Sequence, residues 1–161
     1  MRKIYLDFNK KINTKMNIMI FAEGTILKPK SLFSLYNHNV YVPIGNAVEL
    51  IKSWNMQGAN IIFCTSRKRR QADDMANLLK KYGFIGEFLA VREAKEKYAD
   101  VVEIINPDIL IEDDCRSIGG AWQMCITKVS PEIKMKIKSI VVPEFKGIDK
   151  LPNDIKLLNN Y

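Results

Sequence analysis

The chain has 161 residues, a length typical of one domain that can bury a sizeable core. It is 47% hydrophobic and 27% charged, with eight Gly and six Pro, which excludes collagen-like, low-complexity and wholly disordered classes. The net charge is +7, with the basic excess at the two ends of the chain, and no apolar run approaches the ~20 residues of a membrane span.

Short runs rich in β-branched residues alternate with helical patterns along the chain, which is typical of βαβ units around a parallel sheet. Strands are predicted over residues 17–22, 60–65, 87–91, 108–112 and 139–142. Helices with apolar residues at i, i+3, i+4 and i+7 are predicted around residues 47–54, 72–79 and 98–105, and a shorter one from Ser130. Asn46 and Glu49 are spaced as a capping box for the first of these helices.

Three segments are less regular. Residues 28–43 are predicted either as a β-hairpin over the strand ends or as a plain loop with packed aromatic residues, and residues 2–8 as an edge strand. The basic run 67–70 is interpreted as a solvated helix start rather than a nucleic-acid patch, because no aromatic residues are interleaved with it. We expect one domain over residues 1–161, with an edge segment at 1–16, a core at about 17–145 and a C-terminal extension at 146–161.

Three cysteines and one histidine limit the available chemistry. Cys64, Cys115 and Cys125 are widely spaced and lack a Cys-x-x-Cys pair, so we expect reduced thiols in a cytoplasmic protein. With His38 as the sole histidine, a Cys/His zinc site and histidine-centred base catalysis are poorly supported. Any chemistry must therefore depend on carboxylates.

Polar residues follow three of the predicted strands at the point where each strand ends. They are Glu23-Gly24-Thr25, Thr65-Ser66-Arg67 and Glu112-Asp113-Asp114. The carboxyl ends of parallel strands meet at one edge of a sheet, where ligands bind. Carboxylates suit Mg²⁺, whereas hydroxyl and guanidinium groups suit a phosphoryl group. Each motif alone could be a turn or a helix cap, but the three together predict a ligand site.

This ordered set resembles the haloacid dehalogenase (HAD) superfamily of phosphohydrolases. Residues 18–25 (IMIFAEGT) align with its first motif, hhhDxDGT, in which h is hydrophobic, and residues 61–65 (IIFCT) align with its second. Lys97, or alternatively Lys95, matches a lysine upstream of the fourth motif, and Asp113-Asp114 match that motif's acidic pair. Residues 107–120 also look like small nucleotidase-like members.

The resemblance implies a three-layer α/β/α Rossmann-like parallel sheet without a separate cap domain. It also implies magnesium as the cofactor, bound weakly because one ligand position is Phe21. The implied metal-binding residues are Glu23, Asp113 and Asp114. The implied catalytic residues are Glu23, Thr65 and Lys97, and Gly24, Thr25, Ser66 and Arg67 are expected to bind substrate, although a surface role for Arg67 is an equal alternative.

The first motif departs from the family pattern at its two acidic positions. Phe21 stands where the family has the aspartate that attacks phosphorus, and a phenyl ring can neither attack nor bind a metal ion. Glu23 replaces the second aspartate and reaches one methylene further. Asp7 is a conceivable substitute nucleophile, but an edge-strand turn explains it better.

Two functions from different classes follow. The first is a HAD-like phosphohydrolase that acts on a small phosphate ester or nucleotide, impaired by Phe21. The alternative is a non-catalytic module that binds a phosphate-containing ligand or a protein partner. Nucleic-acid binding through the basic ends ranks last, and no membrane attachment is expected.

Overall fold

The computed structural model describes residues 2–3, 15–31 and 40–161. Its centre is a six-stranded sheet in which every adjacent pair of strands is parallel. In spatial order the strands are β1 (Arg2–Lys3), β6 (Phe88–Val91), β5 (Asn60–Thr65), β2 (Asn17–Phe21), β7 (Ile109–Asp113) and β8 (Lys138–Val142). The five strands predicted after residue 16 are confirmed to within a residue or two at their ends.

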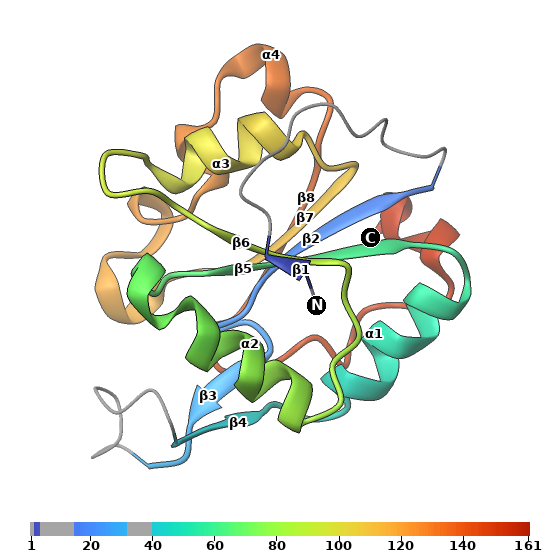
Figure 1. Cartoon of the computed structure of the whole chain (residues 1–161). Coiled ribbons are helices and arrows are strands. Elements are labelled where there is room, and N and C mark those ends of the chain that lie inside the picture. The colour runs from blue at the N-terminus through green and yellow to red at the C-terminus, as the bar shows by residue number, and fades with distance from the viewer. Residues whose placement is uncertain (1, 4–14, 32–39) are drawn as a thin grey trace.

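Helices cover both faces of the sheet, with α1 and α2 on one side and α3 and α4 on the other (Figure 1). The α-helices are α1 (Ala47–Met56), α2 (Ala72–Lys81), α3 (Tyr98–Ile105) and α4 (Pro131–Lys134). The short 3₁₀ helices are η3 (Arg69–Gln71), η4 (Arg116–Ile118), η5 (Gly120–Trp122), η6 (Ile126–Lys128) and η7 (Ile155–Asn160). The expected three-layer α/β/α fold is therefore confirmed.

Side chains of the central strands alternate between two hydrophobic cores. Ile18 and Ile20 on β2 pack on the side of α1 and α2, whereas Met19 packs on the side of α3. Because successive side chains of a strand point to opposite faces, a strand covered on both sides is apolar throughout. Burial on both faces explains why these strands were recognisable as continuous apolar runs.

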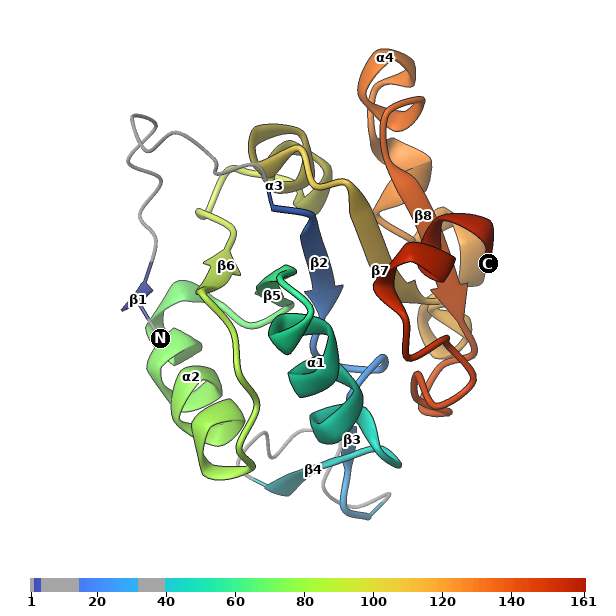
Figure 2. The same cartoon turned by 90° about the vertical axis from the view of Figure 1, so that its right-hand side faces the viewer.

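A two-stranded antiparallel hairpin lies beside the main sheet. Its strands are β3 (Leu27–Pro29) and β4 (Tyr41–Pro43), with Pro29 opposite Tyr41 (Figure 2). The hairpin alternative for residues 28–43 is thus confirmed in the described part, while residues 32–39 lie outside it. The pairing matters for function because it delivers Tyr41 to the site described below.

The N-terminal edge strand is confirmed for Arg2–Lys3, which pairs with β6. Asp7, considered as a substitute nucleophile, lies outside the described residues. In the part of the chain that the structure describes, no helix is long and apolar enough to cross a membrane. Cys64, Cys115 and Cys125 are free thiols, as expected.

The predicted capping box at the start of α1 is wrong. The Asn46 side chain makes no cap hydrogen bond, because Asn46 has φ −94° and ψ 21° instead of the extended backbone that an N-cap usually adopts. Its backbone N–H donates to Asp149 Oδ1 at 2.8 Å. The C-terminal segment therefore anchors this helix, and Ile148, Leu151 and Leu158 are buried in the same core.

Candidate functional site

The first part of the site is a set of three donors at the end of β5, here called the cradle: Thr65 Oγ1, the Ser66 N–H and the Arg67 guanidinium. All three face the Glu23 carboxylate. Thr65 Oγ1 donates to Glu23 Oε1 at 2.7 Å, the Ser66 N–H donates to Oε2 at 3.2 Å, and Arg67 Nε lies 3.4 Å from Oε1. The structure thus brings together four of the residues expected from sequence.

Arg67 is buried, so the surface role considered for it is wrong. Its side chain is 1% exposed, and its Cζ lies 5.7 Å from the centroid of the Tyr41 ring on the hairpin. Burial lowers the pKa of the Arg67 guanidinium, and the negative charge of Glu23 opposes that shift. The physical reason for the inward orientation is that Glu23 and Tyr41 provide a counter-ion and a ring face inside the fold.

Thr65 organises the local backbone as well as the carboxylate. As the last residue of β5 it is fully buried, and its Oγ1 accepts the Arg67 N–H at 3.1 Å while donating to Glu23. A hydroxyl can do both at once, which a valine of similar shape cannot. The side chain therefore links the turn after β5 to Glu23.

Aromatic packing holds the side chain of Phe21, the residue that aligns with an aspartate in the first motif of the superfamily that the sequence resembles. The Phe21 ring at the end of β2 meets the Tyr98 ring edge-on, with centroids 5.7 Å apart and planes at 80°. Tyr98 Oη donates to the Ser66 carbonyl at 2.7 Å, and Arg92 Cζ lies 5.0 Å from the centroid of the same ring. Phe21 is therefore held in a cluster that also supports the cradle backbone.

The second part of the site is the acidic cluster, formed by Asp113, Asp114 and Glu144. One carboxylate oxygen from each lies within 4.8 Å of the other two. Glu144 was missed at the sequence level, although it follows the predicted strand 139–142. The rule that polar residues after neighbouring strands meet at one edge could have found it.

Asp113 is the most enclosed member of the acidic cluster. Its Oδ1 accepts the Cys115 N–H at 2.9 Å, and Thr25 Oγ1 donates to its Oδ2 at 3.4 Å. Burial raises the pKa of the Asp113 carboxyl, and the charge of Glu144 adds to the rise. Gly24 makes room for this carboxylate, since a Cβ on Gly24, whose φ is +85°, would lie 2.4 Å from Asp113 Oδ2.

The other two members of the cluster are connected through backbone and loop contacts. Asp114 Oδ1 accepts the Glu144 N–H at 3.0 Å. Glu144 accepts two hydrogen bonds from Ser117, one from its N–H at 2.7 Å and one from its hydroxyl at 2.6 Å. Hard oxygen ligands that lie close together, as in the acidic cluster, suit a divalent cation such as Mg²⁺.

The Glu112 carboxylate has a different role from the acidic cluster. It accepts hydrogen bonds from the Cys125 and Ile126 N–H groups, at 2.6 and 2.9 Å, and so anchors a loop.

The predicted lysine of the site is not brought into contact with the other residues. Lys97 precedes α3, where its N–H donates to Asp100 Oδ2 at 2.7 Å, and its side chain is exposed. Lys95, the alternative, is also exposed. Within the described ranges, no interaction ties either lysine to the cradle or to the acidic cluster.

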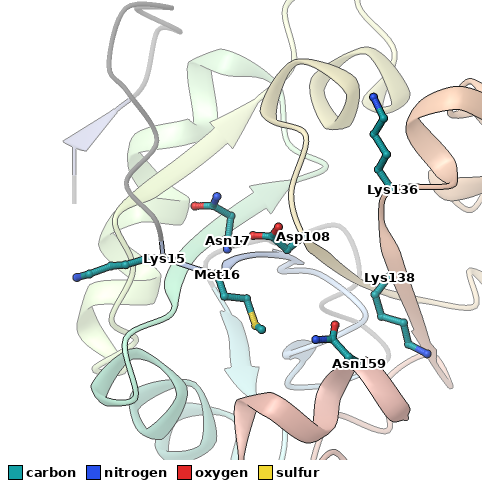
Figure 3. Close-up of a pocket in the computed structure, with 7 residues that line it drawn as sticks. All are labelled: Lys15, Met16, Asn17, Asp108, Lys136, Lys138 and Asn159. Atoms are coloured by element: carbon teal, nitrogen blue, oxygen red, sulfur yellow. Dashed lines mark hydrogen bonds between the residues drawn. The ribbon is translucent and has the colours of Figure 1, made fainter.

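A pocket of about 570 Å³ lies at the opposite, amino-terminal edge of the sheet and is separate from this site. It is lined by Lys15, Met16, Asn17, Asp108, Lys136, Lys138 and Asn159 (Figure 3). Lys15 and Lys136 extend away from the other side chains, and Lys138 Nζ donates to the Tyr161 carbonyl at 2.8 Å. The cradle and the acidic cluster lie instead at the carboxyl edge of the sheet.

Comparison with solved structures finds the same architecture at low sequence identity. The class C acid phosphatase from Bacillus anthracis has a TM-score of 0.58 and 14% identity, over 87% of this chain and 75% of that chain. A chain of the Pnkp1/Rnl/Hen1 complex has a TM-score of 0.57 and 12% identity, over 86% of this chain and 50% of that chain. An uncharacterized protein from Listeria monocytogenes serotype 4b has a TM-score of 0.53 and 12% identity, over 91% of this chain and 99% of that chain.

This chain therefore spans about half the length of the Pnkp1/Rnl/Hen1 chain that it matches. No protein-family model matches the sequence, and no curated protein does. At these identities the similarity concerns the fold alone. Together with the order of its strands, this shows a three-layer α/β/α Rossmann-like fold that the chain shares with the class C acid phosphatase.

Proposed function

We propose that this chain is a HAD-type domain that binds a small phosphate ester or a nucleotide, and in which hydrolysis of that ligand is severely impaired. The observation that carries the proposal is the Phe21 ring, packed against Tyr98 where the family has its attacking aspartate. Loss of a nucleophile can reduce turnover on the order of 10⁶-fold. Binding is retained in this proposal because the groups that would hold a phosphate are present.

The phosphate would be held by the cradle, in which a hydroxyl, an amide N–H and a guanidinium converge. These are the donors that phosphoryl oxygens prefer, and a buried arginine strengthens the electrostatic attraction. Gly24 and Thr25 would line the side next to Asp113. Lys97 would join only if its exposed side chain turned toward the phosphate.

Magnesium is proposed as the cofactor. Asp113 and Asp114 would hold it, with Glu144 as a third carboxylate and Glu23 contributing through its backbone carbonyl. The donor set fits, because hard carboxylate oxygens from three residues lie within 4.8 Å of one another. The ion would neutralise charge on the bound phosphoryl group. Without a carboxylate at position 21, we expect weaker metal binding than a complete site has.

Phosphate release from a panel of phosphate esters that includes nucleotides tests this function. We expect background release from the natural chain and Mg²⁺-dependent release from the Phe21→Asp, Glu23→Asp double variant, which restores the family's two acids. Glu93→Gln, on a neighbouring loop, is the control and should behave as the natural chain does. Release by the natural chain at the rate of the double variant would contradict the proposed impairment.

A non-catalytic binding module is the second candidate. The Glu23 carboxylate in the cradle favours it, since this arrangement accepts an anion without any reaction. Thermal shift with inorganic phosphate and nucleotides tests it, because a ligand that binds the folded state raises the melting temperature. Stabilisation together with absent turnover in both the natural chain and the double variant would favour this candidate over the first.

A protein partner is a variant of the second candidate. Trp122 is 84% exposed on η5, and Ile118 is 65% exposed on η4. Both 3₁₀ helices follow Asp113 and Asp114 in the chain. Apolar side chains that gather into an exposed patch mark contact surfaces, and this form of the proposal takes Trp122 and Ile118 as part of such a patch. An absence of response to every phosphate compound would favour this form of the proposal.

A further inference from the structure

We infer that Glu23 is the resident anion of the cradle, so that a ligand's phosphate binds only after displacing the Glu23 carboxylate. The inference rests on the proposed phosphate-binding function and adds a role for Glu23 that differs from acid–base chemistry. Glu23 would then be the residue that sets how strongly the site binds an external anion.

The contacts of Glu23 are those that a phosphoryl group would need. Its two carboxylate oxygens accept hydrogen bonds, Oε1 from Thr65 Oγ1 at 2.7 Å and Oε2 from the Ser66 N–H at 3.2 Å, and Arg67 Nε lies 3.4 Å from Oε1. The first two contacts are hydrogen bonds to an ionised acceptor, which are roughly twice as strong as neutral ones, and the third is an ion pair. An external oxyanion and the Glu23 carboxylate therefore compete for the same donors.

Burial explains why the cradle holds an internal anion. Arg67 is 1% exposed, and a buried guanidinium without a counter-ion is strongly unfavourable. Tyr41 contributes a ring face but no negative charge at ordinary pH. Glu23 supplies the charge, and its additional methylene relative to aspartate lengthens its reach across to β5.

Displacement of Glu23 requires only a side-chain rotation. Its backbone is fixed by a bridge to Leu27, and the next residue, Gly24, donates its N–H to Leu27 O at 2.9 Å and accepts from Phe145 N at 2.7 Å. The Glu23 side chain is 12% exposed, so it lies close to the surface of the site. A phosphate can therefore enter without rearrangement of β2.

Calorimetric titration of the whole chain with inorganic phosphate tests the inference. We compare the natural chain with Glu23→Gln, which is nearly isosteric but neutral, and with Glu23→Ala, which empties the position. Both variants should bind phosphate with a Kd lower by about tenfold or more, because one competing charge-assisted interaction has been removed. Glu93→Gln, the matched control, removes an exposed carboxylate that pairs with Arg69 outside the cradle and should leave the Kd unchanged.

The melting temperature provides a second readout. Glu23→Ala removes the carboxylate that faces Arg67, so the variant should have a lower melting temperature than the natural chain. Phosphate should then increase the melting temperature of the variant by more than it increases that of the natural chain. Phosphate affinity in both Glu23 variants equal to or weaker than in the natural chain would overturn the inference, and so would a Glu23→Ala melting temperature that phosphate does not change. The proposed function fails separately, if the natural chain and the Phe21→Asp, Glu23→Asp variant neither bind nor hydrolyse any phosphate ester.

Discussion

The cradle and the acidic cluster lie at the same edge of the sheet but balance their charges differently. In the cradle, Arg67 faces Glu23 at 3.4 Å, and both side chains are largely buried. In the acidic cluster, three carboxylates gather, and among the described residues the basic side chain that pairs with them is Arg116, 4.0 Å from Asp114 and 86% exposed. Solvent screens such an exposed pair, so it offsets little of the repulsion.

This difference indicates what each region requires from a ligand. The cradle is complete without one, so an added anion must compete with Glu23. The acidic cluster carries unbalanced negative charge, so an added cation is favourable. A phosphate ester bound together with Mg²⁺ would replace the Glu23 carboxylate in the cradle and add a cation to the acidic cluster, whereas Mg²⁺ alone would change only the acidic cluster.

The largest expected effect comes from Gly24, which lies against Asp113 of the acidic cluster and directly follows Glu23. Gly24→Ala puts a Cβ 2.4 Å from Asp113 Oδ2 at a φ of +85°, and we expect a loss of about 3 kcal/mol in the free energy of unfolding. Chemical denaturation measures it. Gly58→Ala is the control, because Gly58 has φ +100° and nothing within 4 Å of a Cβ, so only the backbone strain should remain. Equal losses in the two variants would show that the contact with Asp113 is unimportant.

Magnesium should stabilise the protein through the acidic cluster. Because Mg²⁺ would bind only the folded state, a concentration about 100 times the Kd should increase the free energy of unfolding by about 2.7 kcal/mol. The increase should appear as a higher melting temperature, and EDTA should reverse it. Glu144→Gln and Asp114→Asn should reduce the increase in melting temperature that Mg²⁺ causes. Asp149→Asn is the control and should retain the increase, because the Asp149 carboxylate accepts the Asn46 N–H and is not part of the acidic cluster. A full response in the first two variants would place the metal elsewhere.

Thr65→Val tests the cradle without changing any charge. The variant removes a donor to Glu23 and an acceptor for the Arg67 N–H, and we expect a loss of about 2 kcal/mol in the free energy of unfolding. Thr127→Val is the matched control, because its hydroxyl donates to the Met124 carbonyl at an exposed position and should matter less. If both variants lose the same stability, the cradle is not the stronger network.

The smallest effect is a change in the pH dependence of stability. The pKa of Asp113 is raised by burial in the folded state, so its contribution to stability is full below the ordinary carboxyl pKa and is lost as pH rises through the raised value. In EDTA, Asp113→Asn should therefore gain stability relative to the natural chain as pH rises from about 4 to 7. Denaturation at several pH values measures this, with Glu132→Gln as an exposed carboxylate control; a constant difference would contradict it.

Several features of the fold were predictable from local sequence. The strand 60–65 was found with its observed limits, because burial on both faces leaves a continuous apolar run. The helix ends at Gly83 and Asn106 were also recognisable, since both adopt positive φ, at +82° and +46°. The Asn46 capping box failed because the Asn46 backbone conformation depends on Asp149, which lies far along the chain.

The site was only partly predictable. Parallel strands deliver their carboxyl ends to one edge, so the proximity of Glu23 and Thr65 followed from strand order. The burial of Arg67 did not follow, because it depends on Tyr41 from the hairpin. Glu144 became part of the acidic cluster only through the pairing of β8 with β7.

Local sequence thus determined which residues form strands and helices and which polar groups follow the strands, because side-chain periodicity is a property of neighbouring residues. The tertiary structure decided what those polar groups contact. The Glu23 carboxylate contacts the cradle and not the acidic cluster, because the ends of β5 and β7 lie on opposite sides of β2 and the buried guanidinium is on the β5 side. Electrostatic attraction over a few ångströms, between residues more than 40 positions apart, made that choice.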